Sequence, residues 1–121
     1  MASTGNIIIK NLAAVDKTFV PAVAVPNGTQ YRETSSPVTG PLTLDVTHKF
    51  ASASSTSNNA HSARFQKIAL NGSGQVRSAY INISISVPKD GVTPADVSDL
   101  GAFMRNFLSD AGLNDLLLGK Y

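Results

Sequence analysis

The stretch that decides the fold is residues 77–88, which read RSAYINISISVP. Apolar side chains at positions 79, 81, 83, 85 and 87 alternate with polar ones at 78, 80, 82, 84 and 86. Successive side chains of a strand point to opposite faces, so this period of two predicts a strand over 75–87. One apolar and one polar face are typical of an antiparallel sheet that is covered on one side only.

Other strands are predicted on the N-terminal side of this stretch. Residues 42–50 alternate in the same way, with Leu42, Leu44 and Val46 on the apolar face. Residues 51–60 lack bulky apolar side chains and predict a flexible hairpin loop, and a strand at 61–70 leads to a turn at 71–74.

The first 35 residues predict shorter strands at 7–9, 19–25 and 29–35. Pro21 has no amide hydrogen to donate, so we expect its strand to be at an edge or broken there. Asn27 and Gly28 form a strong tight-turn signal between the second and third strands.

The pattern becomes helical after Pro88. Thr93 predicts an N-cap, Pro94 suits the first helical position, and Asp96 suits the first turn. We expect Gly112 to end this helix as its C-cap, and a second helix to run over about 113–119, with Leu113 or Asn114 near its cap. The apolar stripe of the first helix, which we expect to be buried in a dimer interface, comprises Val97, Leu100, Met104, Phe107 and Leu108.

The predicted architecture is one α+β domain over 1–121, with an N-terminal β-hairpin and an antiparallel five-stranded sheet followed by two C-terminal helices. The hairpin and first sheet strand occupy about 1–35, the main strands 42–88, and the helices 93–119. About 25 helical residues cannot cover such a sheet alone, so we expect a second subunit to lend its helices.

Composition narrows the function classes. None of the 121 residues is cysteine, which excludes disulfides and thiolate chemistry. The apolar runs are far shorter than the ~20 residues of a membrane span, and the N-terminus has no signal-peptide pattern, so we expect no membrane partner and no export. Residues 1–89 carry eight Lys/Arg and three Asp/Glu, whereas residues 90–121 carry two and five. This asymmetry suits a surface that faces a polyanion, or is ordinary scatter of surface charge.

No pattern indicates an enzyme, a cofactor or a metal. His48 and His61 flank the 51–60 loop without a carboxylate at metal-ligand spacing, and we interpret them as exposed strand-end histidines. Asp96 and Asp99 suit the start of a helix better than acid–base catalysis.

The polar sheet face suggests RNA binding. Tyr80 is a large ring among small polar residues, and such a ring can stack on an unpaired base. Asn82 can contact a base edge, and Lys49 and Arg64 can neutralise phosphates. The strand at 61–70 leaves two possibilities open, because either Arg64 and Gln66 or Phe65 and Lys67 can share this face. The alternative for the whole face is an ordinary solvated surface. The predicted RNA-binding residues are Tyr80, Asn82, Ser84, Thr43, Asp45, Thr47, Lys49, Arg64 and Gln66.

Residues 77–88 closely resemble the last long strand of the coat proteins of single-stranded RNA bacteriophages, the leviviruses. Those proteins carry an Arg-Ser-Tyr-x-Asn segment, alternate through the strand and reach a proline before two helices. The early hairpin at 18–36, the strand 42–49, the loop 51–60 and the C-terminal helices are similar as well.

The resemblance implies an intertwined dimer with a continuous antiparallel sheet, and an icosahedral shell built from many dimers that packages genomic RNA in the virion. It also implies that a dimer binds an RNA hairpin and represses replicase translation in the bacterial host cytoplasm. On the matching positions, Tyr80 would stack on a loop base and Asn82 would contact base or sugar. The alternative function is a dimeric RNA-binding regulator that forms no shell.

Overall fold

The computed structural model describes residues 5–54 and 56–120. The chain divides into two compact units, residues 1–86 and 87–121. The first unit holds the sheet and the second holds the helices.

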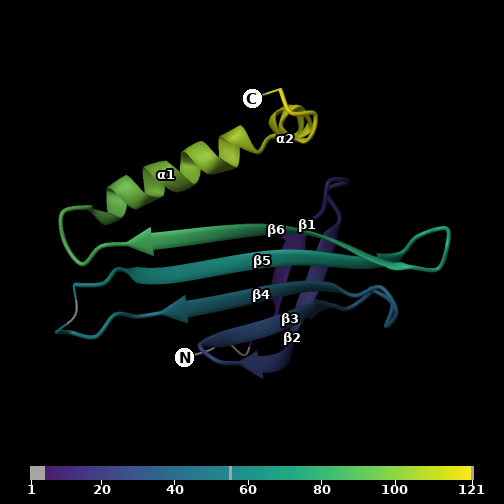
Figure 1. The fold of residues 1–121 in the computed structure, drawn as a ribbon, viewed down its shortest axis with the longest axis horizontal. Coiled ribbons are helices and arrows are strands. Elements are labelled where there is room, and N and C mark those ends of the chain that lie inside the picture. The colour runs from purple at the N-terminus through teal and green to yellow at the C-terminus, as the bar shows by residue number, and fades with distance from the viewer. Residues whose placement is uncertain (1–4, 55, 121) are drawn as a thin grey trace. The chain divides into compact units, whose positions relative to one another are not determined.

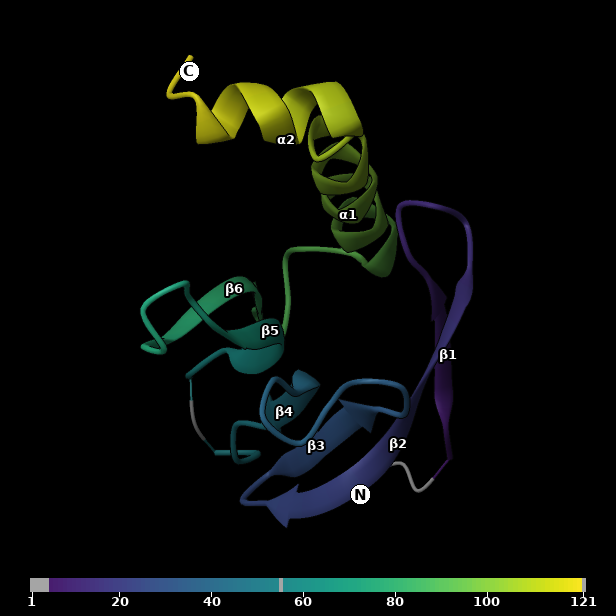
Figure 2. The same ribbon diagram turned by 90° about the vertical axis from the view of Figure 1, so that its right-hand side faces the viewer.

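The first unit is a six-stranded sheet in which each strand is hydrogen-bonded to the strand before it in the sequence. Figure 1 shows β4, β5 and β6 running together while β1 and β2 turn steeply away from them. Seen along the long strands, the sheet is strongly curled (Figure 2). The strands are β1 (Ile7–Lys10), β2 (Asp16–Val25), β3 (Gly28–Glu33), β4 (Leu42–Lys49), β5 (Asn59–Leu70) and β6 (Val76–Val87).

The predicted fold class is confirmed, with one difference in the strand count. The N-terminal hairpin is not an addition to a five-stranded sheet, because β1 and β2 are the first strands of a single six-stranded one. Antiparallel pairing from Ile7 opposite Phe19 to Lys10 opposite Asp16 joins β1 to the rest.

The core of this unit lies on one face of the strands β2 to β4. Phe19, Tyr31 and Leu44 are buried there, and partly buried apolar side chains from β1, β4 and β5 pack against them. Residues that face each other across an antiparallel pair share a side of the sheet, and Tyr31 lies opposite Leu44, which lies opposite Phe65. The alternation predicted for 42–50 is therefore observed, with Leu44 4% exposed.

Glu33 is an acid on this buried face. Its carboxylate accepts hydrogen bonds from the backbone amide of Ser35 at 3.0 Å and from the Ser35 hydroxyl at 2.7 Å. The hydroxyl bond, more than any other contact, lowers the pKa of the Glu33 carboxyl from its usual value of 4.5.

The β2–β3 turn is displaced by one residue from its predicted position. Val25 pairs with Gly28, so the two loop residues are Pro26 and Asn27, and Asn27 adopts a positive φ of 65°. Gly28 is already in β3, where an added Cβ would collide with the carbonyl oxygen of Val46 on β4. The glycine is thus needed for close strand approach rather than for the turn itself.

Pro21 lies where the sequence predicted an irregularity. The register of β2 against β3 shifts between Pro21 and Val23. Pairing with β1 ends at Phe19, so the missing amide hydrogen of Pro21 breaks no ladder on that side.

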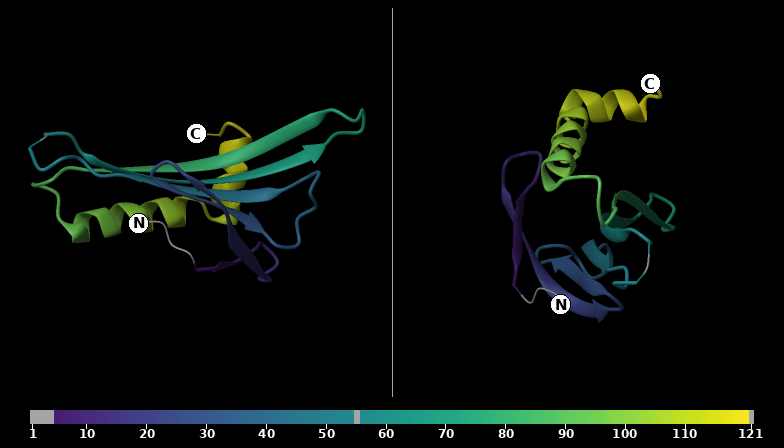
Figure 3. Two further views of the ribbon diagram at one scale, coloured as in Figure 1. Left: turned by 90° about the horizontal axis from the view of Figure 1, so that it is seen from below. Right: turned by 90° about the vertical axis from the view of Figure 1, so that its left-hand side faces the viewer.

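The second unit consists of α1 (Pro94–Phe107) and α2 (Asp110–Leu117). Thr93 caps α1 as predicted, because its hydroxyl accepts from the Asp96 amide at 3.2 Å and the Asp96 carboxylate accepts from the Thr93 amide at 3.0 Å. The two helices meet at a bend, which is visible from two directions in Figure 3.

The predicted boundary between the helices is wrong. Gly112 does not end α1, whose C-cap is Leu108; it lies inside α2, and neither Leu113 nor Asn114 caps that helix. Ser109 is the N-cap instead, with its hydroxyl accepting from the Gly112 amide at 3.4 Å. A Cβ at Gly112 would collide with the carbonyl oxygen of Phe107, so the glycine permits the tight bend.

Candidate nucleic-acid interface

The polar residues predicted on β4 and β5 share one face of the sheet. Thr43 lies opposite Gln66, and Asp45 lies opposite Arg64. Thr47 lies opposite Ser62, with their hydroxyls hydrogen-bonded to each other, and Lys49 lies opposite Ala60. We call this side of β4, β5 and β6 the polar face.

The open question about residues 61–70 is settled by the packing of Phe65. Its ring meets the ring of Phe19 edge-on, with centroids 5.8 Å apart, on the core side. Lys67 is on that side as well and donates to the Gly40 carbonyl at 2.7 Å. Arg64 and Gln66 therefore lie on the polar face.

Tyr80 joins β6 to this face. The guanidinium carbon of Arg64 lies 3.9 Å from the centroid of the Tyr80 ring, which is close enough for a cation–π contact. Tyr80 is 58% exposed. By strand alternation Asn82 and Ser84 lie on the same side as Tyr80, so the structure brings all nine predicted residues onto one face.

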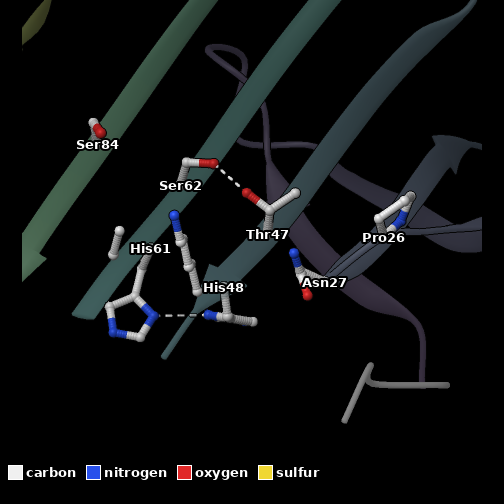
Figure 4. A pocket seen from close by; sticks show the side chains of 9 residues that line it. Pro26, Asn27, Thr47, His48, His61, Ser62 and Ser84 are labelled. Atoms are coloured by element: carbon white, nitrogen blue, oxygen red, sulfur yellow. Dashed lines mark hydrogen bonds between the residues drawn. The ribbon is translucent and has the colours of Figure 1, made fainter. Parts of the chain in front are cut away.

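A pocket of about 390 Å³ lies at the β4–β5 end nearest the β2–β3 turn (Figure 4). It gathers Thr47 and Lys49 of β4, Ser62 of β5 and Ser84 of β6 around the turn residue Asn27. No acid lines this pocket among the residues that the structure describes. The side chains of His48 and His61 line it as well, and its hydroxyl, amide, imidazole and ammonium groups can hydrogen-bond to a ligand.

His48 and His61 form a pair, and the interpretation as exposed strand-end histidines is wrong. They face each other across β4 and β5, with their Nδ1 atoms 2.8 Å apart (Figure 4). The pair is part-buried, and the ring of Phe50 stacks on His48 with centroids 6.2 Å apart. Within the described ranges, no three His, Cys, Asp or Glu side chains gather closely enough to hold a metal ion.

Sequence reasoning missed three residues on the polar face. Gln30 lies opposite Asp45 and Arg32 opposite Thr43, so β3 extends the face beyond β4. Ser62 is the third, through its bond to Thr47. The alternation of side chains within 29–35 was the available signal. Only the pairing register with β4 shows that the even-numbered residues of β3 lie on the polar face.

Apolar side chains are exposed on the other side of β6. Ile81, Ile83 and Ile85 are 49%, 38% and 42% exposed, although they alternate with the polar-face residues. They belong to the same apolar side of the sheet as Phe65, yet the described residues of the first unit cover them only in part.

The helix α1 also leaves its apolar side chains exposed. None of its described residues is buried, and Phe103, which the prediction omitted, is 70% exposed. Of the predicted stripe, Leu100, Met104 and Phe107 are exposed, whereas Val97 and Leu108 are partly buried. In the part of the chain that the structure describes, neither helix has the length and apolar character required to cross a membrane.

The comparisons with known proteins define the fold. No family model and no curated protein matches the chain. Among solved structures, the virus-like particle of Beihai levi-like virus 21 matches with a TM-score of 0.75 and 15% identity, covering 98% of this chain and 96% of that one. The virus-like particle of bacteriophage AVE019 matches with a TM-score of 0.71 and 8% identity, covering 93% and 92%.

The coat protein of bacteriophage EMS014 also matches, with a TM-score of 0.65 and 17% identity over 85% of this chain and 72% of that one. A curled antiparallel sheet followed by two C-terminal helices is thus an architecture found in viral shell subunits. The chain has the fold of the coat proteins of levi-like phages, as its resemblance in 77–88 predicted.

Proposed function

We propose that this chain is the coat protein of a single-stranded RNA phage, which assembles as dimers into an icosahedral shell and packages RNA. The observation that carries the proposal is the likeness in fold, over 98% of the chain, to a subunit of a virus-like particle. Such a role is structural and needs no catalytic site.

Exposed apolar surface supports the dimer. The three isoleucines on the apolar side of β6 are exposed, as are Leu100, Phe103, Met104 and Phe107 of α1. Exposed apolar patches of this kind mark surfaces that bind another protein. A second copy that lays its helices on this sheet would bury both surfaces, so the interface residues proposed are Val97, Leu100, Met104, Phe107 and Leu108.

The free edge of β6 supports the same arrangement. β6 is the last strand in the sheet order, so one of its edges pairs with no other strand among the described residues. Unpaired edges with apolar side chains are templates for pairing with another strand. Two copies joined at this edge would form one continuous antiparallel sheet.

The polar face is the proposed RNA-binding surface. Tyr80 offers a stacking platform, Asn82 can contact a base or sugar, and Lys49 can neutralise phosphates. The pocket around Thr47 and Lys49 is large enough for an unpaired base or a phosphate. We propose that the face contacts packaged RNA and a hairpin whose binding represses replicase translation, with assembly in the bacterial host cytoplasm.

Expression of the chain in bacteria tests the proposal. Electron microscopy and size-exclusion chromatography should find megadalton particles, and nuclease-protected RNA should be extracted from them. A stable RNA-binding species of twice the chain mass, without particles, would favour the regulator instead. A monomer that ignores RNA at low ionic strength would contradict both functions.

A further inference from the structure

Asp45 is an acid at the centre of a face proposed to bind a polyanion, and its surroundings are unusual. It lies directly opposite Arg64 across β4 and β5, where opposite charges normally attract. The ion pairs among the described residues are Lys10–Asp16 and Lys120–Asp115, and Asp45 and Arg64 are in neither.

The Arg64 side chain contacts the Tyr80 ring and not the Asp45 carboxylate. Its guanidinium carbon is 3.9 Å from the centroid of the Tyr80 ring, so it covers one face of the stacking platform. This contact leaves two complementary atoms without partners. Within the described residues, the Oδ1 atom of Asp45 and the Nε atom of Arg64 are buried and have no hydrogen-bond partner.

Buried polar atoms without partners are unfavourable and rare, and each calls for a physical reason. Here Oδ1 of Asp45 is an acceptor and Nε of Arg64 is a donor, and the two residues face each other across neighbouring strands. A rotation of the Arg64 side chain away from Tyr80 would let Nε donate to the Asp45 carboxylate, and an arginine–carboxylate pair is a strong hydrogen-bonded contact.

We propose that Arg64 covers Tyr80 in the free protein and moves onto Asp45 when an RNA base stacks on Tyr80. A planar base and a guanidinium cannot occupy the same side of one ring, so stacking on that side displaces Arg64. Asp45 then receives it. This inference rests on the proposed RNA-binding function and assigns Asp45 as a positioning residue for Arg64.

The displacement also removes an electrostatic penalty. A carboxylate without a cationic partner repels nearby RNA phosphates, whereas an ion pair of Asp45 and Arg64 carries no net charge. The free protein would therefore keep Tyr80 covered, and bound RNA would create the ion pair. An acid that looks unsuited to this face thus becomes part of the bound state.

Asp45→Asn gives opposite expectations for the two readings of this residue. Simple charge repulsion predicts tighter RNA binding in the variant, because a negative charge is lost. The proposal predicts weaker binding, by about 3- to 10-fold, because displaced Arg64 loses its hydrogen-bonded ionic partner. Unchanged or tighter binding would overturn the proposal.

Fluorescence anisotropy with a fluorescein-labelled 20-nucleotide oligoadenylate measures the effect, at protein concentrations where light scattering shows no particles. Asp16→Asn is the matched control, since it removes the same charge from β2 of the same sheet and should not weaken binding. In an Arg64→Ala background, Asp45→Asn should no longer weaken binding. If Asp45→Asn weakened RNA binding just as much in that background, Asp45 would contact RNA directly and the proposal would be contradicted.

Nuclear magnetic resonance of the wild-type dimer provides a test that does not depend on a variant folding. The Arg64 Nε–H resonance should shift and exchange more slowly with water when the oligoadenylate is added. A resonance that stays unchanged while RNA binds would overturn the Arg64 movement and leave the proposed function intact. If the wild type binds no RNA, the proposed function itself fails.

Discussion

The strands β2 to β4, the strand β6 and the helix α1 all carry apolar side chains along one side, but those side chains are buried to different extents. Phe19, Tyr31 and Leu44 are at most 4% exposed, whereas Ile83 of β6 and Met104 of α1 are 38% and 48% exposed. The first region completes its own core. β6 and α1 each carry large apolar side chains that are partly exposed, and the proposed dimer would bury both.

Met104→Asp should have the largest effect on this contrast. If α1 is buried between two copies, the variant places an unpaired charge in an apolar interface, which costs about 3–5 kcal/mol. We expect no soluble dimer and no particles, as measured by size-exclusion chromatography and electron microscopy. Ser98→Asp, which adds the same charge at an exposed position of α1, should assemble normally. Normal particles from Met104→Asp would mean that the interface face of α1 is misassigned.

Leu44→Ala tests the self-contained region. Truncation of a buried leucine typically destabilises a domain by about 2–5 kcal/mol through lost burial and a residual cavity. Urea unfolding followed by circular dichroism should show a lower midpoint.

Ile83→Ala sharpens the comparison with that variant. Its side chain is already 38% exposed in the single chain, so its loss should act mainly through the dimer. We expect a destabilisation of about 1–2 kcal/mol and particles that dissociate at lower urea than the wild type. Ile83→Ala can also be measured in a folded monomeric variant, for which Met104→Asp is the candidate. An equal loss of stability there would show that Ile83 is buried within its own subunit.

Tyr80→Ala tests the opposite side of β6. Loss of a stacking platform should weaken RNA binding by roughly 1–3 kcal/mol and leave assembly intact, because Tyr80 lies on the polar face. Anisotropy with labelled single-stranded RNA measures the first effect, and electron microscopy measures the second. Unchanged affinity would remove Tyr80 from the proposed site.

The alternation of β6 and β4 was predictable because it is a local property of the chain. No competing signal interrupts the period of two in 77–87. The predicted start of the strand, residue 75, differs by one residue from the observed start at Val76. The cap at Thr93 was predictable for the same reason, since every atom of the capping box comes from residues 93–96.

Features that depend on pairing between distant residues were not predictable. Only the register decides that His48 meets His61, that Arg64 rather than Phe65 joins the polar face, and that Gln30 extends it. The prediction of the α1–α2 boundary failed because two capping signals, Ser109 and Gly112, lie three residues apart. The choice between them follows from contact of Gly112 with the Phe107 carbonyl, which the sequence does not reveal.

Glu33 gives the smallest expected effect, and it concerns the self-contained region alone. Hydrogen bonds from Ser35 lower the pKa of its carboxyl below the usual 4.5, so the folded state favours the ionised form. The stabilisation is therefore fully present above pH 4.5 and is lost as the pH falls through the lower folded-state value. Glu33→Gln should unfold at lower urea than the wild type at pH 7, and the difference should shrink at pH 3.5. A difference of the same size at both pH values would mean that the charge of Glu33 does not stabilise β3, and the region would then owe its stability to apolar packing.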